Sequence, residues 1–229
     1  MRRSYYAGNK LAAASRRYNA RLTTAKRLEA EKVPDETIRH QTGWFRGRYD
    51  HRWRTELPDD TFALSGLRFQ PLFDKASAAW RYEYTTDLAA LLLDPLFHLA
   101  YPCLGTLRVA LCYGEKQAET ASYCKEQQLI QVCTTYQDGL HRLLVHELQH
   151  AIQHEEGFAL GGCPSEFKRG EKGRFRPYAE CLADYQKLAG EIEACDVESR
   201  VSFTAAQRQA HAPFSHAPVS ITEVRLRYA

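Results

Sequence analysis

The stretch that decides the fold is residues 143–158, which reads LLVHELQHAIQHEEGF and contains the pattern H-E-x-x-H. His146 and His150 are four residues apart, so on an α-helix they are offset by only about 40° and their imidazoles face one point. Two imidazoles at this separation suit Zn²⁺, and the intervening Glu147 can activate a water bound to the metal. The pattern therefore predicts a metal-binding helix that the rest of the chain holds and covers.

The flanking residues predict that this stretch is helical, with one buried face. Asp138 and Gly139 offer a helix start, and Gly157 is typical of a helix end. Apolar residues recur at helical spacing at Leu140, Leu143, Leu144, Leu148, Ala151 and Ile152. Glu147 projects inside this apolar stripe, where a carboxylate is costly unless a metal and its water compensate it. This favours a metal site over the alternative, a surface helix with histidines on a solvated rim.

The third metal ligand has to come from elsewhere in the chain. Pro177 is well placed to begin a second helix, for which we expect residues 178–200. Periodicity puts Glu191 and Glu193 at opposite edges of its buried stripe and does not choose between them. A Glu from a second helix completes a known two-His zinc arrangement that leaves the fourth position for water. His154 is a rival, but ligands at i, i+4 and i+8 span about 12 Å, so we expect it to lie around the site or at the surface.

These residue types predict metal-assisted hydrolysis. The metal would polarise a carbonyl, and Glu147 would act as the general base toward water. The reaction also needs a hydrogen-bond donor for the developing oxyanion. Tyr178, Tyr185 and His154 are candidates for this donor, and the sequence gives no basis for ranking them.

Charge separates an N-terminal segment from the rest of the chain. Residues 1–32 carry nine Lys and Arg against two Glu, which gives 9 − 2 = +7, whereas the whole chain carries +3 and the remainder therefore 3 − 7 = −4. We expect a basic amphipathic helix or tail at residues 1–32 and the catalytic domain at residues 33–229. The basic segment can contact nucleic acid or an acidic partner, but packing on the domain or on a second subunit is the more common use of such a helix.

Composition and cysteine usage favour a cytoplasmic protein. The 229 residues suffice for one sizeable domain. Seven cysteines, an odd number without any C-x-x-C pair, favour free thiols in a reducing compartment. No stretch approaches the roughly 20 apolar residues of a membrane span, and residues 1–20 lack the apolar core of a signal peptide, so we expect no membrane association.

The remaining pattern predicts an α+β fold. Alternation predicts strands at residues 52–57, 80–85, 106–113 and 128–134, and loops at residues 115–122 and 159–176. We expect a small mixed or antiparallel sheet packed on the H-E-x-x-H helix and on the second ligand-bearing helix. Residues 129–133 come just before the metal helix, where a zinc peptidase would place the strand along which a peptide lies, although an ordinary sheet strand has the same sequence.

Several motifs together resemble a zincin-like metallopeptidase domain, of the gluzincin type, found in large polyvalent proteins of phages and mobile elements. They are HELQHAIQ at residues 146–153, EGFALGG at 156–162, Tyr178, GEIEA at 190–194, Arg200, and TGWFRGRYDHRWRTEL at 42–57. The likeness spans about residues 25–215. It implies a zincin fold, a bound Zn²⁺, a peptide or protein substrate, and the first Glu of an E-x-x-A pattern, Glu191, as the third ligand. The chain departs from the family at Cys195, where an Arg is usual.

We therefore expect a zinc metallopeptidase that hydrolyses peptide bonds with a Glu-activated, zinc-bound water. Two alternatives keep the same core: a catalytically silent zincin-fold interaction or scaffold module, and a protease toxin of narrow specificity. The intact Glu147 favours the enzyme, because a scaffold needs no Glu at this position.

Overall fold

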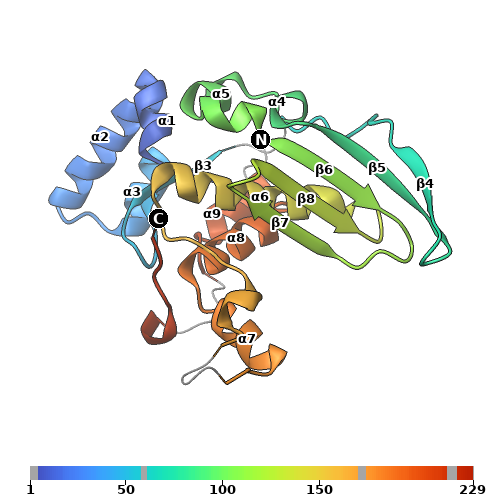
Figure 1. The fold of residues 1–229 in the computed structure, drawn as a ribbon. Coiled ribbons are helices and arrows are strands. Elements are labelled where there is room, and N and C mark those ends of the chain that lie inside the picture. Colours follow the sequence, from blue (N-terminus) through green and yellow to red (C-terminus); the bar gives the residue numbers. More distant parts are fainter. Residues whose placement is uncertain (1–4, 58–60, 170–173, 216–220, 229) are drawn as a thin grey trace.

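Helix α6 (Gly139–Glu156) lies between two β-sheets in the computed structural model, which describes residues 5–57, 61–169, 174–215 and 221–228 (Figure 1). The fold is α+β, as predicted, with two sheets and nine α-helices within those ranges. Helix α6 begins after Asp138 and ends at Gly157, which adopts the left-handed conformation with φ of 65°. The start and the end that the sequence predicted for this helix are confirmed.

The larger sheet has five strands and covers one face of α6. Its order is β4 (Gln70–Asp74), β5 (Ala79–Asp87), β6 (Arg108–Tyr113), β8 (Leu129–Thr134) and β7 (Thr120–Cys124). Strands β6 and β8 are parallel, and the other neighbours are antiparallel. Alternate residues such as Val109, Leu111, Ile130 and Val132 are fully buried in one core with the apolar side of α6.

The position of β7 bears on two predictions from the sequence. Residues 115–122 were predicted as a loop, whereas β7 begins at Thr120. For residues 129–133 the sequence allowed either a strand along which a peptide lies or an ordinary sheet strand, and β8 is paired on both sides, with β6 and with β7, as an ordinary sheet strand is. Among the described residues, β7 has no partner strand on its outer edge, and it lies next to α6.

The smaller sheet ties the beginning of the chain to the core. It has the order β1 (Tyr5–Ala7), β3 (Trp53–Leu57) and β2 (Trp44–Arg46), all antiparallel. Residues 5–7 are fully buried in the same core as α6. The sequence predicted β3 but not β2, whose three residues are too few for a clear alternation.

The basic N-terminal segment forms two helices, α1 (Asn9–Ala14) and α2 (Arg16–Ala30), separated by the extended Ser15. The apolar side of α2 packs on α3 (Asp35–Thr42) and on the small sheet, in a second core cluster. Its members are Ala12, Leu22, Ala25, Leu28, Ile38, Trp44 and Trp53. The segment is therefore an amphipathic unit packed on the rest of the fold.

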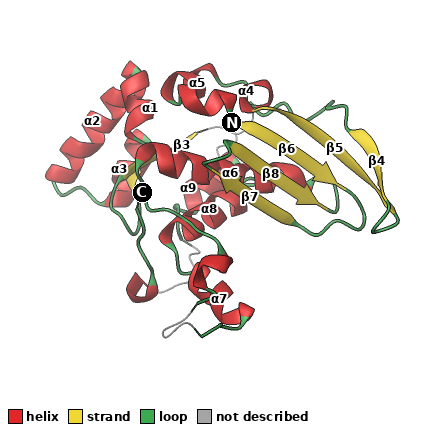
Figure 2. Cartoon of the chain, viewed as in Figure 1, coloured by secondary structure: helices red, strands yellow, loops and turns green. Residues whose placement is uncertain are grey.

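The predicted helix at residues 178–200 is two helices, α7 (Tyr178–Tyr185) and α8 (Ala189–Ser199). The break lies at the extended Leu188, which forms an isolated β-bridge with Arg225 near the end of the chain. Main-chain hydrogen bonds join Ala189 to Arg225 and Arg225 to Lys187. A distant segment therefore interrupts the helix, and Figure 2 shows α8 beside α6.

Shorter helices complete the described chain: α4 (Leu88–Leu91), α5 (Pro95–Ala100) and α9 (Ala205–Ala210), with 3-10 turns at Pro102–Thr106, Pro164–Phe167 and Ile221–Glu223. Asp94 caps helix α5 by accepting from the main-chain N–H groups of Leu96 and Phe97. Among the described helices, none is both long and apolar enough to cross a bilayer.

Candidate metal centre

Helices α6 and α8 bring two imidazoles and one carboxylate together in a buried site. The Nε2 atoms of His146 and His150 are 3.2 Å apart. Glu191 of α8 faces them, with Oε1 at 3.3 Å from His150 Nε2 and Oε2 at 3.7 Å from His146 Nε2. One ligand atom from each of the three residues lies within 4.8 Å of the others. Zinc bonds of about 2.1 Å in a tetrahedron separate ligand atoms by about 3.4 Å, so these spacings suit a single Zn²⁺.

The carboxylate of Glu191 is incompletely satisfied by the protein. Its Oε1 accepts a hydrogen bond of 2.9 Å from the main-chain N–H of Gly162. Its Oε2 is buried and makes no hydrogen bond with any described residue. A buried carboxylate oxygen without a partner is costly, and a cation between the two imidazoles would remove this cost. The donor set and this unsatisfied oxygen both fit a metal ion.

Glu193, the rival third ligand, points away from the imidazoles. Its Oε2 accepts from Arg54 Nε, and its Oε1 accepts from the side-chain amides of Gln149 and Gln153 at 2.8 and 3.2 Å. Gln149 and Gln153 lie on α6 and Arg54 lies on β3, and together they engage both carboxylate oxygens of Glu193. The structure therefore places Glu191, and not Glu193, beside the histidines.

Each histidine has a hydrogen-bond partner at Nδ1 that orients its ring. Nδ1 of His146 is 2.7 Å from Glu198 Oε2, and Nδ1 of His150 is 2.9 Å from Gln153 Oε1. Glu198 also forms an ion pair with Arg142. Such partners fix which nitrogen faces the metal. Sequence reasoning missed both, although Glu198 lies two helical turns after Glu191, and Gln153 one turn after His150.

A second trio of possible ligands shares His146 with the first. Cys195 and Glu198 bring atoms within 4.8 Å of an imidazole nitrogen of His146 and of each other. Glu198 is already engaged by His146 Nδ1 and by Arg142. Cys195 is exposed as a residue, but partial desolvation of its thiol, together with the charge of Glu191, raises the pKa of the thiol to about 11. We therefore assign Cys195 and Glu198 to the surroundings of His146 and not to the candidate metal site.

The general base candidate, Glu147, lies in the wall of a cavity of about 340 Å³ next to the imidazoles. The cavity is lined by His150, His154 and Tyr185, by residues 121–123 of β7, by residues 160–164, and by further side chains. Tyr178 does not line it and is 66% exposed, so the structure separates Tyr178 from the site. His154 lies one turn beyond His150, outside the ligand trio, with its ring 5.8 Å from that of Tyr123.

The ionisable groups of the site shift one another's pKa values. Burial raises the pKa of Glu147, and the two histidines counteract part of this effect. Burial would lower the pKa of His150, but the carboxylate of Glu191 raises it to about 10. Burial opposes ionisation of Glu191, yet His150 and His146 hold the pKa of this carboxyl well below its usual range. Burial and the neighbouring Glu191 raise the pKa of the Tyr185 hydroxyl, so it stays protonated as a hydrogen-bond donor.

Comparison with known families matches the N-terminal part of the chain, which precedes α6 and α8 in the sequence. Residues 4–65 match the family described as large polyvalent protein associated domain 23. The match covers 65 − 4 + 1 = 62 of the 229 residues and agrees with the predicted likeness to large polyvalent proteins. No curated protein and no solved structure gives a significant match. The matched segment contains β1, β2 and β3 and supplies Arg54, which donates to Glu193.

Proposed function

We propose that the chain is a zinc-dependent metallopeptidase. The observation that carries this proposal is the convergence of His146, His150 and Glu191 on one point, with Glu191 Oε2 buried and without a hydrogen-bond partner among the described residues. Two imidazoles and one carboxylate are a donor set that zinc uses in catalytic sites. The adjacent Glu147 adds the base that hydrolysis requires.

His146, His150 and Glu191 would hold the ion, which supplies a Lewis acid that polarises a carbonyl and makes water easier to deprotonate. Glu147 accepts a proton from the attacking water and passes it to the leaving nitrogen. The hydroxyl of Tyr185, which lines the same cavity, donates a hydrogen bond to the developing oxyanion. Of the three donors that the sequence suggested, Tyr185 is the one that lies beside both Glu191 and the cavity.

Strand β7 supports a peptide or protein as the substrate. Residues 121–123 of β7 line the cavity together with Glu147. The outer edge of β7 has no partner strand within the described parts of the chain. An extended peptide can add to such an edge through main-chain hydrogen bonds, which would bring its carbonyls past Glu147.

The first test is the metal content of the purified chain, measured by mass spectrometry for wild type, His150→Ala, Glu191→Ala and His154→Ala. We expect about one zinc per chain in wild type and in His154→Ala, and a large loss in the other two variants. A wild-type chain that cannot be loaded with zinc would overturn the proposal. If it is loaded, a peptide library then identifies a substrate, and a failure to cleave any peptide or lysate protein would favour the scaffold alternative.

A further inference from the structure

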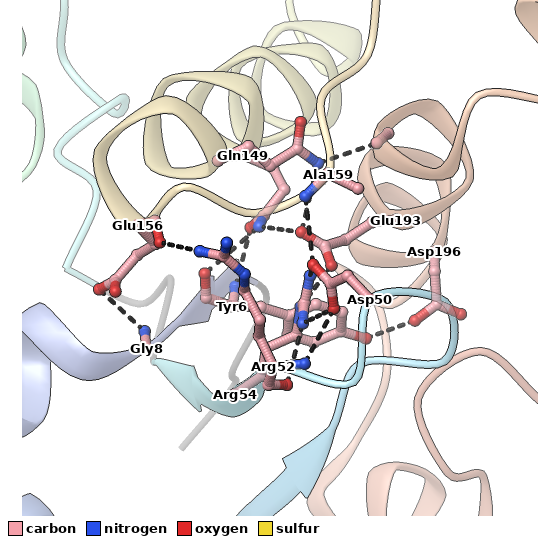
Figure 3. Close-up of polar contacts among 12 residues, drawn as sticks. Tyr6, Gly8, Asp50, Arg52, Arg54, Gln149, Glu156, Ala159, Glu193 and Asp196 are labelled. Carbon is pink, nitrogen blue, oxygen red and sulfur yellow. Dashed lines mark hydrogen bonds and ion pairs between the residues drawn. The ribbon is translucent and has the colours of Figure 1, made fainter. Parts of the chain in front are cut away.

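Arg54 of β3 is buried with two carboxylates, those of Asp50 and Glu193 (Figure 3). Its side chain is 2% exposed. NH1 and NH2 donate to the two carboxylate oxygens of Asp50 at 2.7 and 2.8 Å, and Nε donates to Glu193 Oε2. The guanidinium also lies over the ring of Phe158, 3.9 Å from its centroid. These contacts hold Arg54 in one orientation, and Arg54 in turn fixes the carboxylate of Glu193.

A chain of hydrogen bonds leads from Glu193 to a proposed metal ligand. Glu193 Oε1 accepts from Gln149 Nε2 at 2.8 Å and from Gln153 Nε2 at 3.2 Å. Gln153 Nε2 also donates to the carbonyl of Gly190 at 2.9 Å, so the amide nitrogen of Gln153 faces two acceptors. Its oxygen therefore faces His150 Nδ1, at 2.9 Å. An amide oxygen only accepts, so Nδ1 carries a hydrogen, and Nε2 is the nitrogen that can offer its lone pair to a metal.

We propose that Arg54 is a positioning residue for His150, acting through Glu193 and Gln153. This inference rests on the proposed zinc site. We call the hydrogen-bonded series Arg54, Glu193, Gln153 and His150 the relay. Its donors and acceptors can be assigned from the Arg54 end, because a guanidinium can only donate and a carboxylate can only accept. The relay selects the His150 tautomer that binds zinc through Nε2 and holds the ring in place, as hydrogen-bond partners of metal ligands do. A residue from the segment that matches the polyvalent-protein family is thus part of the metal centre.

Glu193→Gln tests the relay with almost no change in shape. The new amide turns its oxygen to Arg54, and its NH2 group then faces Gln153 in place of an acceptor. We expect zinc affinity, measured by chelator competition, to fall about 10–100-fold. We also expect the hydrogen-bonded Nδ1–H resonance of His150 to be lost or shifted in zinc-loaded protein with ¹⁵N-labelled histidine. Tyr6→Phe is the matched control, because it removes a buried hydroxyl that bonds Asp196 and leaves the relay in place.

A second variant, Gln153→Leu, removes the amide oxygen that accepts from His150 Nδ1. It provides the test if Glu193→Gln does not fold. It should show the same loss of affinity and of the Nδ1–H resonance. If wild type binds zinc and the folded variants bind it equally tightly with an unchanged resonance, the relay is wrong and the metal site stands. The relay is also wrong if Tyr6→Phe weakens zinc binding as much as Glu193→Gln. If wild type binds no zinc, the proposed function fails first, and the relay fails with it.

Discussion

Gly190 on α8 packs directly against Gly161 in the loop that follows α6. A Cβ placed on Gly190 would lie 2.1 Å from the main-chain nitrogen of Gly161. A Cβ on Gly161 would in turn lie 2.1 Å from Glu191 Oε1 and 2.5 Å from His150 Cε1. Two glycines therefore let the loop lie on the metal centre, where the next residue, Gly162, donates its N–H to Glu191.

Gly190→Ala should consequently damage both the fold and the metal centre. The added methyl group meets main-chain atoms, so the loop has to move away from α8. Overpacking of this kind costs about 1–3 kcal/mol. We expect a lower free energy of unfolding in urea and a reduced zinc content. Gly105→Ala is the control, because its Cβ would meet its nearest atom, His98 Nδ1, at an ordinary 3.4 Å. Unchanged stability and zinc content in Gly190→Ala would contradict the close packing.

Glu147→Gln should separate metal binding from catalysis. The carboxylate of Glu147 is not among the three converging ligands, so zinc content should stay at the wild-type level. The neutral amide cannot take a proton from water, and loss of a general base lowers hydrolysis by about 10²–10⁴-fold. The measurement is the cleavage rate of a library-derived peptide together with the metal content. A variant as active as wild type would remove Glu147 from the role of base.

Tyr185→Phe should lower turnover without releasing zinc. The hydroxyl of Tyr185 is beside Glu191 and lines the cavity with Glu147, so its removal deprives the oxyanion of a donor. Loss of one such donor costs about 10²–10³-fold in kcat. Tyr178→Phe is the matched control, because Tyr178 is 66% exposed and outside the cavity. Equal losses in the two variants would argue that neither tyrosine acts in the site.

The elements that could be predicted from sequence are those whose signals are local. Helix α6 has a helical apolar period, a start at Asp138 and an end at Gly157, and all three are properties of neighbouring residues. The break between α7 and α8 has no such signal, because Leu188 continues the apolar stripe and the interruption comes from its bridge to Arg225. Tertiary contacts there override the local pattern.

The choice of the third ligand shows the same limit. Glu191 and Glu193 are equivalent in helical periodicity. Only the resemblance to polyvalent-protein zincins favours Glu191 as the third ligand. In the structure they differ because Arg54 donates a hydrogen bond to the carboxylate of Glu193. Arg54 lies 139 residues before Glu193 in the chain. The periodicity of one helix carries no information about a partner on a distant strand, so the residues alone could not decide it.

The ion pair between Asp50 and Arg54 predicts how stability depends on pH. Burial alone would raise the pKa of Asp50 above its ordinary 3.8, but hydrogen bonds and charge from Arg54 reverse this and lower it. A carboxyl with a lowered pKa in the folded state stabilises the protein fully above its ordinary pKa, and this contribution is lost as the pH falls through the lowered value. Asp50→Asn lacks the contribution at every pH.

Near pH 7 we therefore expect Asp50→Asn to be less stable than wild type by about 1–3 kcal/mol, the value of a charged hydrogen bond in a buried site. The difference between the two proteins should shrink as the pH falls below the ordinary pKa of Asp, because the unfolded wild-type chain then takes up a proton that folded Asp50 binds only at lower pH. Urea unfolding from about pH 7 to about pH 3 measures this difference. Asp87→Asn is the control, because Asp87 is exposed and makes no side-chain cap hydrogen bond. A difference that stays constant over this range would show that the charge of Asp50 does not stabilise Arg54.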